Sequence, residues 1–226
     1  MAKARRKVAN LPVTPVPRDT LPDRIYRRTK ELILNGEIEP GQLVTIQGLA
    51  DAFGVSAMPV REALQRLTAE KALSVVSGRS VGLAELSVER LRDLRRVRLA
   101  IESLAAEWAA ANVSAGDLRS LAKLIATMDG AAADGDSHGY VRANREFHFV
   151  VYRASGSDSL LAIIEGLWLQ VSPYFHLLYG SGNYVVANDQ HKQVLAALRN
   201  RDGAAAGVAI RADIEAAAEI LLDLLA

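Results

Sequence analysis

The stretch TIQGLADAFGVSAMPVREALQRLTAEKALSVVSGRSVGL, residues 45–83, predicts two short helices joined by a tight turn and followed by a β-hairpin. Thr45 is a suitable N-cap, and the apolar residues after it recur every three or four positions, as in an amphipathic helix. Gly54 ends that helix because glycine adopts the left-handed conformation without strain. Ser56 caps the next helix, and residues 77–80 form the hairpin turn. This order predicts a winged helix-turn-helix, which places its second helix in the major groove of DNA.

The composition favours a helical protein that contacts no membrane. The 226 residues are 50% hydrophobic and only 5% aromatic, with no cysteine. The lack of cysteine excludes a disulfide framework and thiolate metal sites, and it fits a reducing cytoplasm. No apolar run reaches the roughly 18 residues that a membrane span needs, and the basic N-terminus lacks the apolar core of a signal peptide. We therefore expect a cytoplasmic protein.

The net charge of +1 hides an asymmetry between the two parts of the chain. Residues 1–84 carry 13 Lys and Arg against 8 Asp and Glu, whereas the remainder carries 14 against 18. A basic N-terminal part on an acidic remainder fits a DNA-reading module attached to a second domain. Ordinary charge scatter gives such numbers too, so the asymmetry gains weight only because it coincides with the helix-turn-helix.

The chain divides into an arm and two domains. Residues 1–20, with three prolines and a basic cluster, predict a flexible arm that either stays solvated or touches DNA phosphates. Residues 21–84 form the winged helix-turn-helix, which starts with a helix to Asn35. Residues 84–87 contain neither glycine nor proline and form a short joint, so movement in the second domain can reach the first. Residues 87–226 predict an all-α bundle of about six helices. The protein is therefore mainly α.

The first helix of the second domain is predicted to be long and to run from Ser87 to about Asn112. We expect its stripe to be Leu91, Leu94, Val97, Leu104 and Trp108. Later helices begin near residues 114, 137, 157, 185 and 202, and Pro173 breaks the fourth.

Three helices of the second domain carry side chains that bind metals. Asn144 and His148 lie four residues apart and so on one helix face, and His191 and Asp213 lie on the last two helices. In an antiparallel bundle these residues can converge in the interior. Together they offer two imidazoles, a carboxylate and an amide. That set suits a divalent metal such as zinc, nickel or manganese. By spacing alone, surface or hydrogen-bonded roles are commoner for such residues.

Arg98 has two interpretations. Glu102 lies one turn on, so spacing alone favours an i,i+4 ion pair. The alternative is an interior guanidinium that binds a carboxylate effector bidentately. The sequence holds no glycine-rich phosphate loop, nucleophile elbow or HExxH motif, so we expect no enzyme.

The string VSAMPVREALQRL, residues 55–67, followed by a short wing, resembles the winged helix-turn-helix of GntR-type bacterial transcriptional regulators. The helical remainder contains VRLAIESLAA, NREFH and HKQVLAALRNRD, and it resembles the FCD sensor domain of their FadR subfamily. The resemblance implies a homodimer that binds double-stranded DNA at a pseudo-palindromic operator. It also implies repression that is relieved by a small carboxylate metabolite.

In that family many sensors hold a metal through an acid and a His one turn apart, plus two further His. The matching residues here are Asn144, His148, His191 and Asp213. Asn144 stands where an Asp is usual and Asp213 where a His is usual, so the carboxylate has moved between helices. The resemblance implies a metal site, although a neutral amide should hold a divalent ion more weakly than a carboxylate does.

By the same resemblance, the residues that contact DNA are Gln47, Ser56, Met58, Arg61, Gly78 and Arg79. Arg61 is the arginine of the recognition helix, and its alternative is a solvated helix-surface arginine. Ala57 and Gln47 stand where family members often carry Arg, which implies a different operator or weaker binding. The other functional hypothesis is a metal-dependent enzyme that acts on a small acid and carries an N-terminal interaction module.

Overall fold

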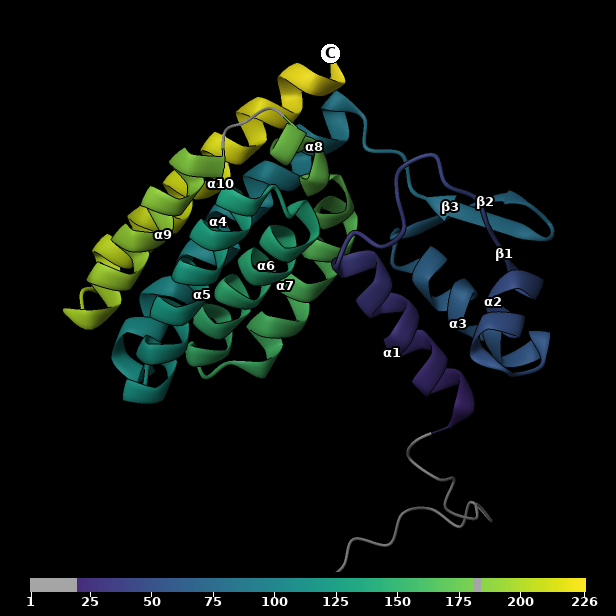
Figure 1. Ribbon diagram of the computed structural model, residues 1–226. Coiled ribbons are helices and arrows are strands. Elements are labelled where there is room, and N and C mark those ends of the chain that lie inside the picture. The colour runs from purple at the N-terminus through teal and green to yellow at the C-terminus, as the bar shows by residue number, and fades with distance from the viewer. Residues whose placement is uncertain (1–19, 181–183) are drawn as a thin grey trace, which may run out of the picture.

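The computed structural model describes residues 20–180 and 184–226. The predicted arm, apart from Thr20, lies outside the described residues. Figure 1 shows the C-terminal helices gathered into a bundle on the left and the winged helix-turn-helix on the right, with α1 between them. The predicted order of elements is therefore present, and the first helix lies where the two parts meet.

Three helices and three short strands make up the N-terminal part. They are α1 (Leu21–Leu34), β1 (Val44–Thr45), α2 (Ile46–Phe53), α3 (Ala57–Ala69), β2 (Leu73–Ser77) and β3 (Ser80–Leu83). The strands form an antiparallel sheet in the order β1-β3-β2, with Val44 opposite Val81 and Leu73 opposite Leu83. The buried face of α3 packs on α1 and holds this small core together.

Local signals explain the helix-turn-helix. The Thr45 side chain accepts a hydrogen bond from the Gly48 N–H, and Gly54 ends α2 at φ +66°. Ser56 is the N-cap residue of α3 but its side chain makes no capping bond. Strand β1 was not predicted, because its two residues become a strand only through pairing with β3. Leu43, just before β1, is 57% exposed and lies outside this small core.

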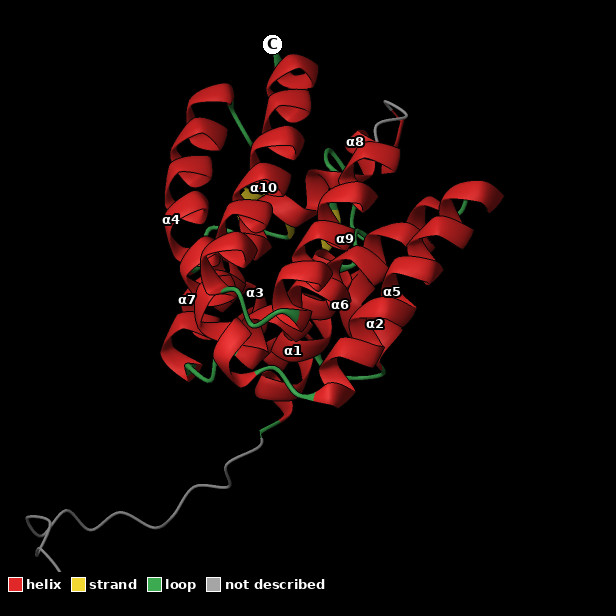
Figure 2. Cartoon of the chain, turned by 90° about the vertical axis from the view of Figure 1, so that its left-hand side faces the viewer, coloured by secondary structure: helices red, strands yellow, loops and turns green. Residues whose placement is uncertain are grey.

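The C-terminal part is all helical in the described residues. Its elements are α4 (Val88–Asn112), α5 (Ala115–Asp134), α6 (Ser137–Ala154), α7 (Asp158–Val171), the 3-10 turn η1 (Ser172–Tyr174), α8 (Phe175–Gly180), α9 (Tyr184–Arg199) and α10 (Gly203–Leu225). Figure 2 shows the long helices of this part packed along one another, with the short α8 at one end. Pro173 lies in η1, so the break predicted after α7 is confirmed. Ser114 with Asp117, and Asp202, cap α5 and α10.

The predicted apolar stripe of α4 was wrong in part. Leu91 and Leu94 are buried, but Val97 is 40% and Trp108 46% exposed, and Leu104 is only partly buried. The face of α4 that points inward instead carries Arg98, Glu102 and small alanines. Alanine and leucine at helical spacing do not tell an inner face from an outer one.

The segment Asp158–Leu178 has the length and apolarity of a membrane span, but half of it is buried inside the fold. Ile164, Trp168 and Leu169 of α7 lie in the bundle core. A helix buried in a protein core can have the same length and apolarity as a membrane span.

The two parts touch at the connector and along α1. The Tyr174 hydroxyl donates to the carbonyl of Ala84 at 2.9 Å and accepts from the N–H of Leu86 at 3.1 Å. Lys30 of α1 forms an ion pair with Glu165 of α7 at 2.6 Å. A side chain of the sensor core therefore holds the connector directly.

Candidate metal centre and DNA-binding surface

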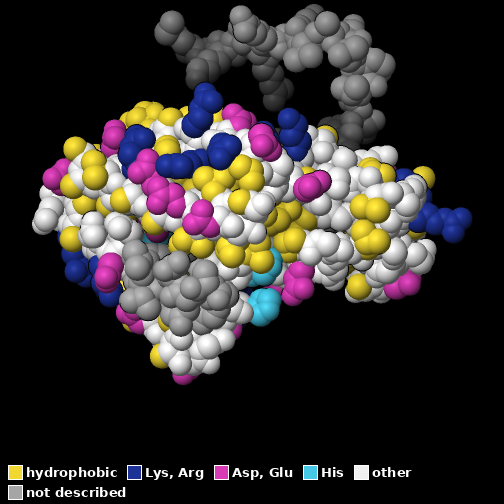
Figure 3. Space-filling view, turned by 90° about the horizontal axis from the view of Figure 1, so that it is seen from above, with side chains coloured by type: hydrophobic (Ala, Val, Ile, Leu, Met, Phe, Trp, Pro, Cys, Tyr) yellow, Lys and Arg dark blue, Asp and Glu magenta, His cyan; other side chains and the backbone are white. Residues whose placement is uncertain are grey.

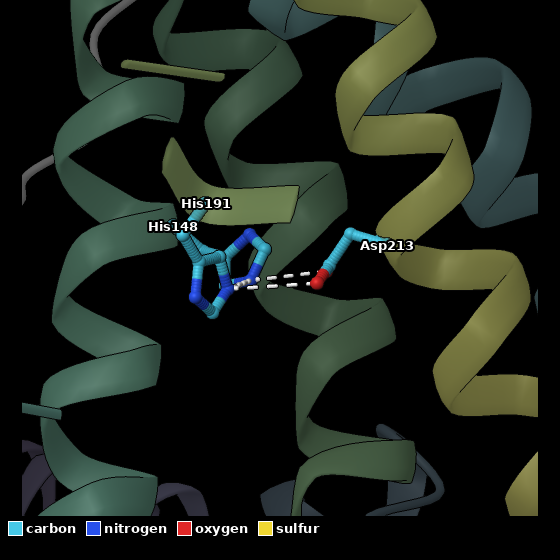
Figure 4. A group of neighbouring side chains, drawn as sticks. All are labelled: His148, His191 and Asp213. Atoms are coloured by element: carbon cyan, nitrogen blue, oxygen red, sulfur yellow. Dashed lines mark hydrogen bonds and ion pairs between the residues drawn. The ribbon is translucent and has the colours of Figure 1, made fainter. Parts of the chain in front are cut away.

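Three buried side chains converge in the helical domain. His148 projects from α6, His191 from α9 and Asp213 from α10 (Figure 4). One donor atom from each lies within 4.8 Å of the others. The two Nε2 atoms are 3.3 Å apart, and they lie 3.3 and 3.5 Å from the Asp213 carboxylate oxygens. The structure thus brings together three of the four predicted ligands.

A tyrosine fixes the orientation of His148. Its Nδ1 lies 3.1 Å from the hydroxyl of Tyr152, one turn later on α6. That hydroxyl donates its proton to Glu102, so it can only accept from the imidazole. The Nδ1 of His148 therefore carries a proton and donates to Tyr152, and its Nε2 faces His191 and Asp213.

Asn188 fixes the orientation of His191 through a hydrogen bond. The Nδ1 of His191 lies 3.1 Å from the Asn188 side-chain oxygen, while the Asn188 amide nitrogen donates to Asp129. The amide orientation makes its oxygen the acceptor, so the His191 proton is on Nδ1. Burial lowers the pKa of His191 to about 4, so the ring is neutral at pH 7.

The donor set fits a divalent cation. With both Nδ1 atoms engaged, the Nε2 atoms of His148 and His191 and the Asp213 carboxylate face one another, and these are nitrogen and oxygen atoms that a divalent ion takes as ligands. A tetrahedral ion with bonds of about 2.0–2.1 Å holds its donors about 3.3–3.4 Å apart. The two Nε2 atoms, 3.3 Å apart, match that value, and they lie 3.3 and 3.5 Å from different oxygens of the Asp213 carboxylate. The carboxylate of Asp213 suits the charge: burial opposes its ionisation, but His191, His148 and Arg98 together hold its pKa below the ordinary value.

Asn144 lies one turn before His148 on α6 and is partly buried. Because Asn144 lies on the same helix as His148, its role as the fourth metal ligand stays a prediction. FCD domains often bind metal, and the His148, His191 and Asp213 set is of the kind that holds one.

Arg98 forms the ion pair that its spacing predicts. Its Nε and Nη2 donate to the two Glu102 oxygens at 2.6 and 3.3 Å, and the pair is buried. Burial disfavours the charge, but Glu102 outweighs it and raises the pKa of Arg98. Trp168 also donates to Glu102 at 3.1 Å. Effector binding by Arg98 remains a prediction, and the guanidinium already has one carboxylate partner.

Sequence reasoning missed the residues that support the metal ligands. Tyr152 follows His148 by four residues and Asn188 precedes His191 by three, so helical spacing alone marks both pairs as neighbours. Glu102, Tyr152 and Trp168 come from three helices, and only the packed bundle shows that they meet.

All six residues predicted to contact DNA lie on the exposed surface of the N-terminal part. Arg61 of α3 and Gly78 of the β2–β3 turn line one hollow of about 280 Å³ between helix and wing. Gln47 is hydrogen-bonded to Asp51 at 2.8 Å, so its amide is already engaged. Figure 3 shows Lys or Arg atoms projecting at the far right-hand end, with Asp or Glu atoms on the same side of the molecule. The contacts of the six residues with DNA remain predictions.

Comparisons with known families match both parts of the chain. Residues 21–83 match the family model described as bacterial regulatory proteins, gntR family, and residues 93–216 match the FCD domain. Together the two matches leave out only the arm, the connector region and the C-terminal end.

Individual relatives agree. The HTH-type transcriptional regulator McbR of Escherichia coli (strain K12) is 32% identical over 170 residues, covering 74% of this chain and 77% of McbR. The HTH-type transcriptional repressor GlaR of the same strain is 25% identical over 195 residues, covering 82% of this chain and 89% of GlaR. The solved E. coli McbR/YncC structure superposes with a TM-score of 0.84 at 27% identity, over 92% of this chain and all of that one. A metal-free FCD domain, that of TM0439, shares the fold with a TM-score of 0.52 at 17% identity, over 62% of this chain and 97% of that one.

Proposed function

Because this chain belongs to the GntR family of bacterial regulators, with an FCD domain behind its winged helix-turn-helix, we propose that it is a metal-containing repressor released by a small carboxylate. Ligand-responsive regulation of transcription through DNA binding is the function of this family. The matched families and relatives are transcriptional regulators and not enzymes, so the hypothesis of a metal-dependent enzyme is dropped.

The observation that carries the sensor half of the proposal is the convergence of His148, His191 and Asp213, whose facing nitrogen and oxygen atoms lie 3.3–3.5 Å apart. His148, His191 and Asp213 would hold a divalent ion, of which zinc, nickel and manganese suit the donors. Three protein ligands leave a coordination position for an exogenous group, and the bound ion would supply the positive charge that attracts a carboxylate. Asn144 and Arg98 are the side chains proposed to complete the site.

The proposed output is operator binding by a homodimer, as GntR regulators typically dimerise and bind operators. Two copies related by a two-fold axis would present two α3 helices, so the operator should be a pseudo-palindrome. Arg61 of α3 and Arg79 of the wing supply the cationic contacts. We propose repression because the relative GlaR is named a repressor. Action on chromosomal DNA places the protein in the cytoplasm.

The proposed coupling runs through α4 and the connector. Glu102 of α4 accepts a hydrogen bond from the Tyr152 hydroxyl, and that hydroxyl is hydrogen-bonded to Nδ1 of the ligand His148. Trp168 of α7, which donates to Glu102, packs edge-on against Phe175 at 5.4 Å between ring centroids. Phe175 follows Tyr174, whose hydroxyl holds the connector. A shift of the metal ligands would therefore reach the connector through side chains in direct contact.

A gel-shift titration tests the DNA half. The probe is the DNA upstream of the protein's own gene, with the Arg61→Ala variant and, as a matched control, Arg199→Ala on the exposed surface of α9. If Arg61 reads a base, its removal should weaken binding by about 1–3 kcal/mol, and the control should bind as the wild type does. Equal binding by wild type and Arg61→Ala would remove Arg61 from the DNA interface.

A further inference from the structure

Helix α3 presents one face to solvent. The buried residues of its other sides pack on α1, α2 and β2. The exposed face carries four side chains at helical spacing, namely Met58, Arg61, Glu62 and Gln65. Because α3 is the second helix of the helix-turn-helix, this face would meet the bases of the major groove in the proposed complex.

Arg66, which is also exposed on α3, is held against α1. Its Nη1 donates to Asp23 at 2.7 Å, and its guanidinium lies 4.0 Å from the ring centroid of Tyr26. Within the described residues, no hydrogen bond or ion pair engages the side chain of Arg61, Glu62 or Gln65. The exposed face of α3 is therefore free to contact a partner, whereas Arg66 is not.

Met58 is the most exposed large apolar side chain in the described part of the chain, at 72%. It is the second residue of α3, and the N-terminal residues of a recognition helix are those that contact base edges. Ala57 before it offers only a methyl group, so neither of the first two side chains of α3 can donate a hydrogen bond. A single exposed methionine needs no explanation by itself. Its place at the base-contacting end of a free face is what indicates an apolar contact with DNA.

The chemistry of the major groove identifies that contact. Its base edges carry hydrogen-bond donors and acceptors and one kind of apolar group, the C5 methyl of thymine. A thioether is only a weak acceptor and has no donor, so it matches the polar groups poorly. Met58 is also unbranched and polarizable, which lets it follow the position of a methyl group closely. This side chain therefore suits thymine.

The polar side chains of the same face would contact other base pairs. Arg61 and Gln65 follow Met58 by three and seven residues, or about 4.5 and 10.5 Å along the helix axis. Successive base pairs are about 3.4 Å apart. Arg61 and Gln65, which suit guanine and adenine, line the hollow beside the wing, and Met58 lies outside it. Met58 would thus lie at one end of the contacted bases, at a base pair that Arg61 does not share.

We propose that Met58 is a specificity-determining residue, which recognises the C5 methyl group of a thymine in each operator half-site. The inference rests on the proposed function, because it needs an operator to which α3 binds. A two-fold dimer makes this contact twice, so removing the methyl group from both half-sites acts twice on the affinity.

Replacing thymine by deoxyuridine removes the methyl group and leaves every hydrogen-bonding group of the base in place. The probe is a duplex that carries the operator, located by footprinting in the DNA upstream of the protein's own gene. Each thymine is replaced in turn, at the symmetrical positions of both half-sites, and the full chain is titrated by gel shift. At one position the wild-type affinity should fall about 4-fold for each half-site, or about 15-fold in all, the effect of one methyl group that is no longer buried.

The variants separate recognition of the methyl group from a structural effect, which would lower both affinities alike. Met58→Ala should bind the thymine and deoxyuridine operators equally, because its side chain no longer reaches the methyl group. Met58→Leu, which keeps an apolar side chain of similar size, should retain a preference for thymine. Val208→Ala, at a 66% exposed site on α10, is the matched control and should discriminate as the wild type does. Because Met58 is exposed, its variants should keep the circular dichroism of the wild type.

Three results would overturn the inference. Wild-type binding that tolerates deoxyuridine at every position would show that no thymine methyl is recognised. A Met58→Ala variant that keeps the full preference for thymine would assign that methyl group to another side chain. Both results would leave the proposed function standing, because the operator is still bound. A wild type that protects no site in the footprint would overturn the proposed function and the inference with it.

Discussion

The hydroxyl of Tyr152 lies between His148, a proposed metal ligand, and the buried ion pair of Arg98 with Glu102. The substitution Tyr152→Phe removes this hydroxyl and with it both hydrogen bonds. In the variant the Nδ1–H of His148 loses its acceptor, and Glu102 loses one donor but keeps Arg98 and Trp168. The imidazole is then free to rotate or to move its proton to Nε2, which would block metal binding.

The expected loss follows from these two contacts. Removing a hydrogen-bonding partner from a metal-ligating histidine lowers metal affinity about 10- to 100-fold, or about 1.4–2.8 kcal/mol. The variant should also unfold more easily, by about 1.5–3 kcal/mol for one buried hydrogen bond to a charged group. Affinity and stability therefore have to be measured separately.

Competition with a chromogenic chelator measures the affinity for zinc and manganese, and urea unfolding measures the stability. Tyr26→Phe is the matched control. Its hydroxyl also donates to a carboxylate, that of Glu70 at 2.8 Å, but in the N-terminal part. That variant should lose some stability and bind metal as the wild type does. Equal metal affinity of Tyr152→Phe and wild type would refute the claim that Tyr152 orients His148.

Two further changes test the connector and the turn. Tyr174→Phe removes the hydroxyl that donates to Ala84 and accepts from Leu86, which should cost about 1–3 kcal/mol of local stability in all. The Leu86 amide hydrogen should then exchange with solvent roughly 5- to 150-fold faster, with metal content unchanged. Unaltered exchange would show that other contacts fix the connector. Gly54→Ala forces alanine into a left-handed turn at φ +66° and should lower the free energy of unfolding by about 1–2 kcal/mol, whereas Gly130→Ala, inside α5, should raise it by about 0.5–1 kcal/mol. Urea titrations measure both, and equal effects of the two substitutions would contradict the turn geometry.

Much of the fold could be predicted because its signals are local. The Thr45 cap, the Gly54 turn and the capping box of Ser114 with Asp117 each depend on residues within four positions. Strand β1 escaped prediction because its two residues depend on pairing with β3, which lies some 35 residues further along the chain. The outer face of α4 escaped because Val97 and Trp108, although 40% and 46% exposed, recur at the same helical spacing as core residues.

The candidate metal centre divides in the same way. Spacing allowed His148, His191 and Asp213 to converge, and the family resemblance singled them out. The ion pair of Arg98 with Glu102 is local and follows from spacing. Tyr152 and Asn188 lie one turn from the histidines that they contact, but their own partners Glu102 and Asp129 come from other helices, so these roles follow only from hydrogen bonds in the packed bundle.

Elemental analysis of the purified full chain, prepared without chelator, tests the central claim most directly. The wild type should contain about one divalent metal ion per chain, and the His148→Ala/His191→Ala double variant should contain almost none. Arg199→Ala, exposed at the C-terminal end of α9 and eight residues beyond His191, should retain the ion. A double variant with undiminished metal content would contradict the site that these three side chains form.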